Sequence, residues 1–198
     1  MSHAAAGAEL LEPGVGVYHK KLGMWVFLAS EVMFFTALIG TYIILRFGAA
    51  ESWPVPSTVL NIPVTAVNTF ILICSSVSMV KAYAAAVQGD QKWLRIWLLV
   101  TVIGGATFVG VQVYEYLSLI HHEHFLPSSG LFGSTFYTMT GFHGFHVSMG
   151  VICMAWVTLQ AFRGRYDAQH YHGVEVVGLY WHFVDLVWII LFTIVYLI

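Results

Sequence analysis

Five long apolar stretches dominate this sequence of 198 residues. They cover approximately residues 22–45, 62–80, 96–117, 131–162 and 174–198. Each contains roughly 20 or more residues, which is enough for an α-helix to cross a hydrocarbon core about 30 Å thick. The composition agrees: 59% of the residues are hydrophobic and only 9% are charged, whereas roughly a quarter are charged in soluble domains. The sequence therefore predicts an all-α integral membrane bundle of five transmembrane helices.

The apolar stretches leave little chain for any other domain. Residues 1–21 form a short N-terminal segment, and residues 22–198 form one five-helix transmembrane domain. The connections between the spans are too short to fold into an extramembrane domain. We therefore expect nearly all of the chain's function to lie within the membrane.

The basic residues predict the orientation of the helices. With five spans, the N-terminal segment, the second connection and the fourth connection share one side of the membrane. That side carries seven of the eight basic residues: Lys20, Lys21, Lys81, Lys92, Arg95, Arg163 and Arg165. The other side carries only Arg46. Because cytoplasmic loops are rich in lysine and arginine, we expect the N-terminus in the cytoplasm and the C-terminus outside.

The charge distribution and the cysteines exclude other classes of protein. The formal net charge is -2 and the basic residues are scattered, so the sequence offers no basic stripe to bind nucleic acid. Cys74 and Cys153 lie inside apolar stretches, so we interpret them as packing residues rather than as a disulfide. Six glycines in the third and fourth spans predict closely approaching helix backbones: Gly104, Gly105, Gly110, Gly141, Gly144 and Gly150.

Ionisable residues inside spans are costly, so each one is a candidate for function. There are seven: Glu31, Glu115, Glu175, His143, His146, His182 and Asp185. Glu115 and Glu175 lie near the ends of their spans, where an interfacial position is the simpler interpretation. At about 1.5 Å per residue, Glu31 lies roughly 13 Å along its span, at nearly the same depth as His143, His182 and Asp185. These residues are predicted to form one polar layer.

The residue types in this layer leave several chemistries open. Two histidines on different helices could ligate a haem, and a deep glutamate with His and Asp could relay protons. The simpler alternative, which we favour from spacing alone, is a set of hydrogen bonds that holds the helices together. No Cys-x-x-Cys pattern supports a metal site. His121, His122 and His124 are best interpreted as a solvated loop.

A series of motifs along the chain resembles a known family. The motifs are Ser30-Glu31-Val32-Met33-Phe34-Phe35, Asn68-Thr69, Gln112-Val113-Tyr114-Glu115-Tyr116, Gly133-Ser134-Thr135-Phe136, Thr140-Gly141-Phe142-His143-Gly144-Phe145-His146-Val147 and Tyr180-Trp181-His182-Phe183-Val184-Asp185-Leu186-Val187-Trp188. From about residue 21 to the C-terminus, the chain resembles subunit III of cytochrome c oxidase, within the haem-copper oxidase superfamily.

The resemblance implies a non-catalytic role in aerobic respiratory electron transport. Subunit III carries no haem or copper, since these cofactors lie in partner subunits. It packs beside the catalytic subunit I, binds phospholipid, and supports assembly, proton uptake and resistance to turnover inactivation. The family's buried acidic residue maps onto Glu31, while His143, His146, His182, Asp185 and Glu115 become intramembrane polar or lipid contacts. The implied location is a prokaryotic cytoplasmic membrane, with subunits I and II as partners and cytochrome c reached only through the complex.

The resemblance also raises alternatives. Larger family members have seven spans, so we expect an extension of the catalytic subunit to supply the two that are missing here. Quinol oxidases of the same superfamily also have a five-span subunit III, and Glu31 together with the Gly133–Phe136 run favours the cytochrome c enzyme. Two further hypotheses are a haem-bearing membrane cytochrome that uses His143 and His182, and a proton-conducting transporter built around Glu31.

Overall fold

The computed structural model describes residues 19–49, 53–121, 124–168 and 170–198. These residues form five long helices: α1 (His19–Gly48), α3 (Ile62–Val87), α4 (Gln91–His121), α5 (Gly130–Phe162) and α6 (His172–Phe192). A short helix α2 (Pro56–Val59) precedes α3, and a π-helical turn (Thr193–Leu197) follows α6. Five helices are long and apolar enough to cross a membrane, which confirms the predicted fold class. Residues 1–18 of the predicted N-terminal segment lie outside the described residues, and its last three residues begin α1.

Three of the helices, α1, α3 and α4, extend beyond the apolar stretches from which they were predicted. The second predicted span corresponds to α3, which ends at Val87 rather than near Val80. The third corresponds to α4, which begins at Gln91 rather than at Ile96. Lys81 does not end the helix, and its ammonium group lies 4.4 Å from the centre of the Trp97 ring. The ends are instead determined by local turn chemistry, which hydropathy does not register.

The turn between α3 and α4 shows this chemistry. Gly89 has a φ of +73°, a left-handed conformation that favours glycine after the end of a helix. The side chain of Asp90 then accepts hydrogen bonds from the backbone N–H groups of Lys92 and Trp93, each at 3.1 Å. It thereby satisfies donors that the first turn of α4 would otherwise leave unpaired. A glycine stop followed by an aspartate cap thus brings α4 back antiparallel to α3.

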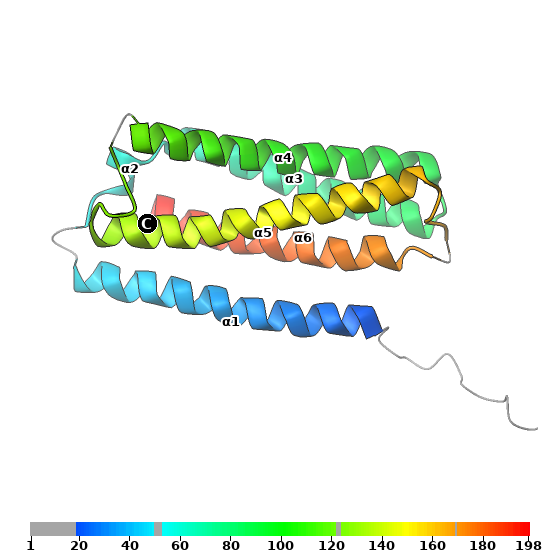
Figure 1. Ribbon diagram of the computed structural model, residues 1–198, viewed down its shortest axis with the longest axis horizontal. Coiled ribbons are helices and arrows are strands. Elements are labelled where there is room, and N and C mark those ends of the chain that lie inside the picture. The colour runs from blue at the N-terminus through cyan, green and yellow to red at the C-terminus, as the bar shows by residue number, and fades with distance from the viewer. Residues whose placement is uncertain (1–18, 50–52, 122–123, 169) are drawn as a thin grey trace, which may run out of the picture.

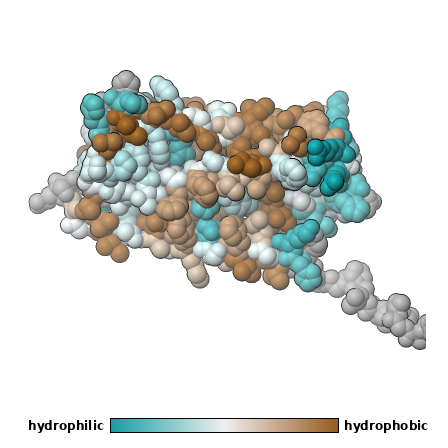
Figure 2. Space-filling view, in the orientation of Figure 1, coloured by the Kyte–Doolittle hydropathy of each residue, from teal (hydrophilic) through white to brown (hydrophobic). Residues whose placement is uncertain are grey.

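Four helices form the body of the bundle and α1 lies along one side of it (Figure 1). α3 packs along α4, α4 along α5, and α6 against both α3 and α5, whereas α1 packs mainly on α6 and α5. α5 slants across the bundle (Figure 1), as expected for a helix of 33 residues that is longer than a bilayer core. Hydrophobic residues cover much of the face in Figure 2, and hydrophilic ones collect mainly at its two ends.

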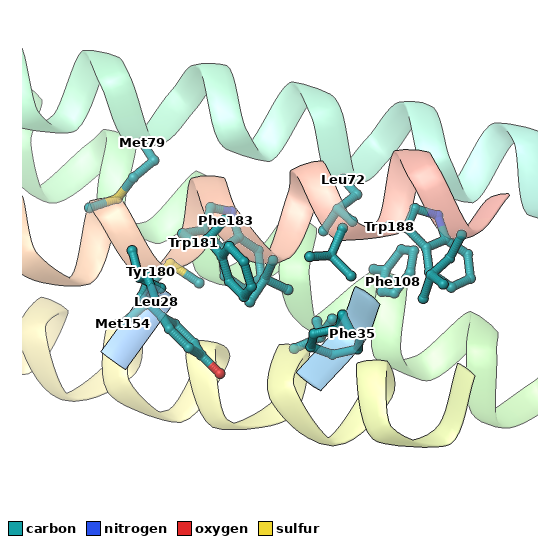
Figure 3. Packing of buried hydrophobic residues seen from close by; sticks show 14 of the residues in the cluster. Leu28, Phe35, Leu72, Met79, Phe108, Met154, Tyr180, Trp181, Phe183 and Trp188 are labelled. Carbon is teal, nitrogen blue, oxygen red and sulfur yellow. The ribbon is translucent and has the colours of Figure 1, made fainter. Parts of the chain in front are cut away.

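The centre of the bundle is built around tryptophan rings from α6 (Figure 3). Trp181 is fully buried, and its indole N–H donates to the Ser75 hydroxyl on α3 at 3.1 Å. A Cβ at Gly105 would lie 2.6 Å from this ring, and one at Gly150 would lie 2.9 Å from it. These two glycines therefore make room for an indole ring rather than for a helix backbone. The predicted close approach of helices is present at Gly104, where a Cβ would lie 2.8 Å from the Cβ of Ser75 on α3, whereas a Cβ at Gly110 or Gly141 would meet nothing within 4 Å.

The two cysteines do not pack in this core. Cys74 and Cys153 are both free and exposed on the outside of the bundle. The interpretation of them as packing residues is therefore wrong. Cys153 lines a hollow between α1, α5 and α6. The apolar sequence around each cysteine does not reveal that its side chain is exposed.

Candidate functional site

A hollow in the bundle surface lies between α1, α5 and α6. There the surface holds a pocket of about 430 Å³, lined mainly by apolar side chains such as Met24, Phe27 and Met149. Its polar wall consists of Glu31 from α1 and His146 from α5. Two of the residues predicted from sequence therefore meet at one site, although they are 115 positions apart in the chain.

Glu31 and His146 are joined by a short contact whose protonation the geometry constrains. The Oε2 atom of Glu31 lies 3.0 Å from Nε2 of His146. The other ring nitrogen, Nδ1, lies 2.7 Å from the carbonyl oxygen of Phe142, and a carbonyl can only accept, so we assign a proton to Nδ1. A hydrogen bond between Nε2 and Oε2 requires a proton on one of the two atoms.

Neighbouring aromatic side chains keep this pair in place. The hydroxyl group of Tyr180 on α6 donates to the backbone carbonyl of His146 at 2.9 Å. The ring of Phe35 packs edge-on against the imidazole of His146, with centroids 5.1 Å apart. Side chains from three helices therefore meet around one imidazole. The pair links α1, which has few other polar contacts, to the rest of the bundle.

His182 and Asp185 form a separate polar group with α3. Nδ1 of His182 lies 2.7 Å from the hydroxyl oxygen of Ser76. Asp185, one turn further along α6, is 8% exposed and also lies beside Ser76. The predicted single layer is thus divided: Glu31 pairs with His146 across the α1–α5 boundary, while His182 and Asp185 face α3.

His143 belongs to neither group. It is fully buried, and its ring stacks on Trp188 with centroids 4.8 Å apart. The rings of Phe35 and Phe108 flank it at 6.4 and 6.1 Å. Neither ring nitrogen has a hydrogen-bond partner among the described residues. His143 and His146 are three residues apart, yet one faces the aromatic core and the other faces α1.

Glu115 lies in a third polar group, nearer the end of the bundle that is opposite the α3–α4 turn. Its Oε1 atom accepts a hydrogen bond of 2.6 Å from the Thr65 hydroxyl group. One residue on, the hydroxyl oxygen of Tyr116 lies 2.5 Å from that of Thr140 on α5. Gln112 adds a hydrogen bond to the backbone carbonyl of Thr140. This group ties α3, α4 and α5 together and is distinct from the Glu31–His146 pair.

Sequence reasoning missed several partners of these residues. Ser76 and Thr65 complete two of the polar groups, but a hydroxyl within an apolar stretch gives almost no sequence signal. Glu175, interpreted as interfacial, pairs with Lys21 at 2.5 Å. His121 ends α4 and His124 is exposed, while residues 122 and 123 of the same motif lie outside the described residues.

The described residues contain no group of three or more His, Cys, Asp or Glu side chains placed to hold a metal ion. A haem held by His143 and His182 also disagrees with the packing. The His143 ring is enclosed between aromatic rings, so no open face is left beside it for a porphyrin. His182 meanwhile bonds to Ser76.

Comparison with known proteins gives the family. A sequence model of cytochrome c oxidase subunit III matches residues 15–198, which is most of the chain. The chain belongs to the cytochrome c oxidase subunit III family. As a subunit III it functions in a complex with other oxidase subunits, and it is a multi-pass membrane protein. Family membership replaces the haem-bearing cytochrome and the proton-conducting transporter as explanations of the polar residues.

Named subunit III proteins from bacteria are similar to this chain. The cytochrome c oxidase subunit 3 of Thermostichus vulcanus is 42% identical over 177 residues, which cover 89% of this chain and 86% of that protein. The probable cytochrome c oxidase subunit 3 of Mycobacterium tuberculosis (strain ATCC 25618 / H37Rv) is 41% identical over 89% of this chain and 87% of its own length. The cytochrome c oxidase subunit 3 of Bacillus sp. (strain PS3) is 36% identical over 90% of this chain and 86% of that protein.

Proposed function

We propose that this chain is the non-catalytic subunit III of a proton-pumping oxidase that takes electrons from cytochrome c and reduces oxygen to water. The match to the family over residues 15–198 carries this proposal. The relatives from Thermostichus, Mycobacterium and Bacillus are all named as cytochrome c oxidase subunits, which supports cytochrome c as the donor. Haem and copper are assigned to the partner subunits I and II, and cytochrome c meets this chain only through the complex.

Within the complex, the proposed role of the chain is to support assembly, lipid binding and sustained proton uptake. The pocket beside Glu31 and His146 supports the lipid part of this role. Its lining is mainly apolar, which suits a phospholipid acyl chain better than a charged substrate. The outward face of α1, including Met33 and Ile44, is exposed and apolar. It can pack against lipid or against a neighbouring subunit.

Removal of the chain tests whether it stabilises the oxidase or takes part in the reduction of oxygen. We expect an oxidase stripped of this subunit to reduce oxygen at first and then to lose activity over repeated turnovers, because the reacting cofactors lie elsewhere. The measurement is oxygen consumption against time, with and without the purified chain added back. Immediate and complete loss of activity, in a complex whose haem and copper are still in place, would contradict a supporting role.

A quinol oxidase of the same superfamily is the alternative function. The two are separated by the electron donor that the purified complex accepts. We expect rapid oxidation of reduced cytochrome c and little oxidation of a ubiquinol or menaquinol analogue. The opposite preference, or a subunit II without a dinuclear copper motif, would assign the chain to a quinol oxidase.

We propose that the chain lies in a prokaryotic cytoplasmic membrane with its N-terminus in the cytoplasm. The first turn of α1, the α3–α4 turn and the α5–α6 connection lie at one end of the bundle (Figure 1), and seven of the eight basic residues belong to that end. A reporter inserted near Gly89 should therefore read as cytoplasmic, and one fused after Ile198 as periplasmic. The reverse pair of results would overturn this orientation.

A further inference from the structure

A second, smaller hollow lies between α3 and α6, on another side of α6 from the Glu31–His146 pocket. It has a volume of about 180 Å³. Glu175 and His182 line it, together with Tyr83 and apolar side chains such as Met79 and Val80. Because Glu175 and His182 are seven residues apart on α6, they lie on one helix face about 10 Å from each other. The hollow therefore connects the charged end of α6 to a histidine deep within the span.

The end at Glu175 is charged and lies at the end of the bundle that carries the basic residues. Glu175 pairs with Lys21 of α1 at 2.5 Å, and Nδ1 of His172 lies 3.7 Å from its second carboxylate oxygen. Tyr83 packs edge-on against Tyr171 close by, with ring centroids 5.9 Å apart. Titratable groups from α1, α3 and α6 thus surround this end, as expected where a span meets water.

The deep end is also polar. His182 bonds through Nδ1 to the Ser76 hydroxyl at 2.7 Å. Beyond it, Asp185 is 8% exposed, and its Oδ1 atom has no hydrogen-bond partner among the described residues. Ionisable side chains at this depth in membrane proteins almost always face protein or a water-filled cavity. The lining between the two ends is mainly apolar, as in the Glu31–His146 pocket, but this hollow runs from the ion-paired end of α6 to a deep histidine, and that position favours water.

We infer that the hollow between α3 and α6 is a water-filled inlet, open at Glu175, that brings water and exchangeable protons to His182 within the span. The volume suffices, because a cavity needs only about 10–15 Å³ to hold one water molecule and the hollow measures about 180 Å³. Gly178 lines the inlet between its two ends. A side chain there would block it, since a Cβ at Gly178 already lies 3.1 Å from the Cε atom of Met79.

Silver ions can test this inlet, because Ag⁺ travels with water, is small, and blocks thiols. The background is the assembled oxidase in membrane vesicles, with Cys74→Ala and Cys153→Ala. His182→Cys reports on the deep end, and Val77→Cys is the control, next in sequence to Ser76 but exposed on the apolar surface of α3. After timed exposure to Ag⁺, the complex is denatured, and the thiols that remain on this chain are counted with a maleimide mass tag.

We expect the cysteine at position 182 to be blocked at least about tenfold faster than the one at position 77, because thiols in apolar surroundings stay protonated and react slowly. Adding Gly178→Leu should reduce the rate at position 182 to that of the control. Equal blocking rates at positions 182 and 77, in the protein that keeps Gly178, would overturn the inlet and indicate an acyl chain in the hollow. If Gly178→Leu left the blocking rate at position 182 unchanged, the inlet would also be overturned, because water would then reach this position by another route.

A second reporter keeps the test decisive if His182→Cys fails to assemble. Val80 lines the same hollow from α3, and Val80→Cys leaves His182 and its bond to Ser76 intact. The same tenfold excess over Val77→Cys is expected for it. A rate equal to that of the control would count against the inlet independently of any change at His182. The inference does not depend on the electron donor of the oxidase, and oxygen consumption is not its readout.

Discussion

Glu31→Ala is expected to weaken the attachment of α1 and to lower the stability of the chain by roughly 1 kcal/mol, the low end of the cost of leaving a hydrogen-bonding group without its partner, because the pair is only partly buried. The partner is His146, whose Nε2 atom faces Glu31 at 3.0 Å and has no other contact in the described residues. The measurement is the temperature at which the chain dissociates from the solubilised oxidase. Phospholipid retained by the purified complex should fall as well, because Glu31 lines the apolar pocket.

Glu31→Gln is the matched control for this prediction. The amide keeps the size of the side chain, and its NH₂ group can donate to the Nε2 atom of His146. We expect normal assembly, near-normal oxygen reduction and little change in the dissociation temperature. If the glutamine variant were as unstable as the alanine variant, charge rather than hydrogen bonding would hold the pair.

A double-mutant cycle separates the pair from the loss of side-chain volume. If Glu31 and His146 stabilise each other, Glu31→Ala and His146→Ala together should cost less than the sum of the two single changes, by roughly 0.5–3 kcal/mol. Strict additivity would contradict a direct contact between the two side chains. This outcome is independent of whether lipid occupies the neighbouring pocket.

The number of spans was predictable from sequence because bilayer thickness imposes a minimum length on each apolar stretch. Helix ends were less predictable, since α3 and α4 continue past the hydrocarbon core to a turn formed by Gly89 and Asp90. Lysine at position 81 resembles a boundary in a hydropathy plot. In the structure it remains helical, because its stem follows the helix surface and its charge reaches the Trp97 ring.

The residue types of the candidate site could be predicted from sequence, but which side chains contact each other could not. Depth along a helix follows from sequence position, so Glu31, His143 and His182 could be placed at similar depths. The direction in which each side chain points depends on helix rotation, which the neighbouring helices determine. His146 rather than His143 therefore faces Glu31, while His143 points into the aromatic core against Trp188. Partners such as Ser76 could be identified only once the helices were placed.

Trp181→Ala is expected to have a larger effect than the changes at Glu31. Trp181 is fully buried, its ring lies against Gly105 on α4 and Gly150 on α5, and its N–H donates to Ser75 on α3. Replacing a buried tryptophan with alanine costs about 3–5 kcal/mol, because the cavity cannot be refilled completely. In a membrane this cost comes from lost packing, since the lipid reference is as apolar as the core.

Trp156, which is 58% exposed on the outer surface of α5, provides the control for this change. Trp156→Ala removes the same atoms but leaves no internal cavity, so its dissociation temperature should stay close to that of the unchanged complex, whereas Trp181→Ala should release the chain at a much lower temperature. Trp181→Phe should be intermediate, because it keeps a ring against the two glycines but leaves the Ser75 hydroxyl without its indole donor. Equal shifts for Trp156→Ala and Trp181→Ala would mean that this layer of α6 does not hold the bundle together. The close approach of α4, α5 and α6 around one indole ring would then have to be stabilised elsewhere.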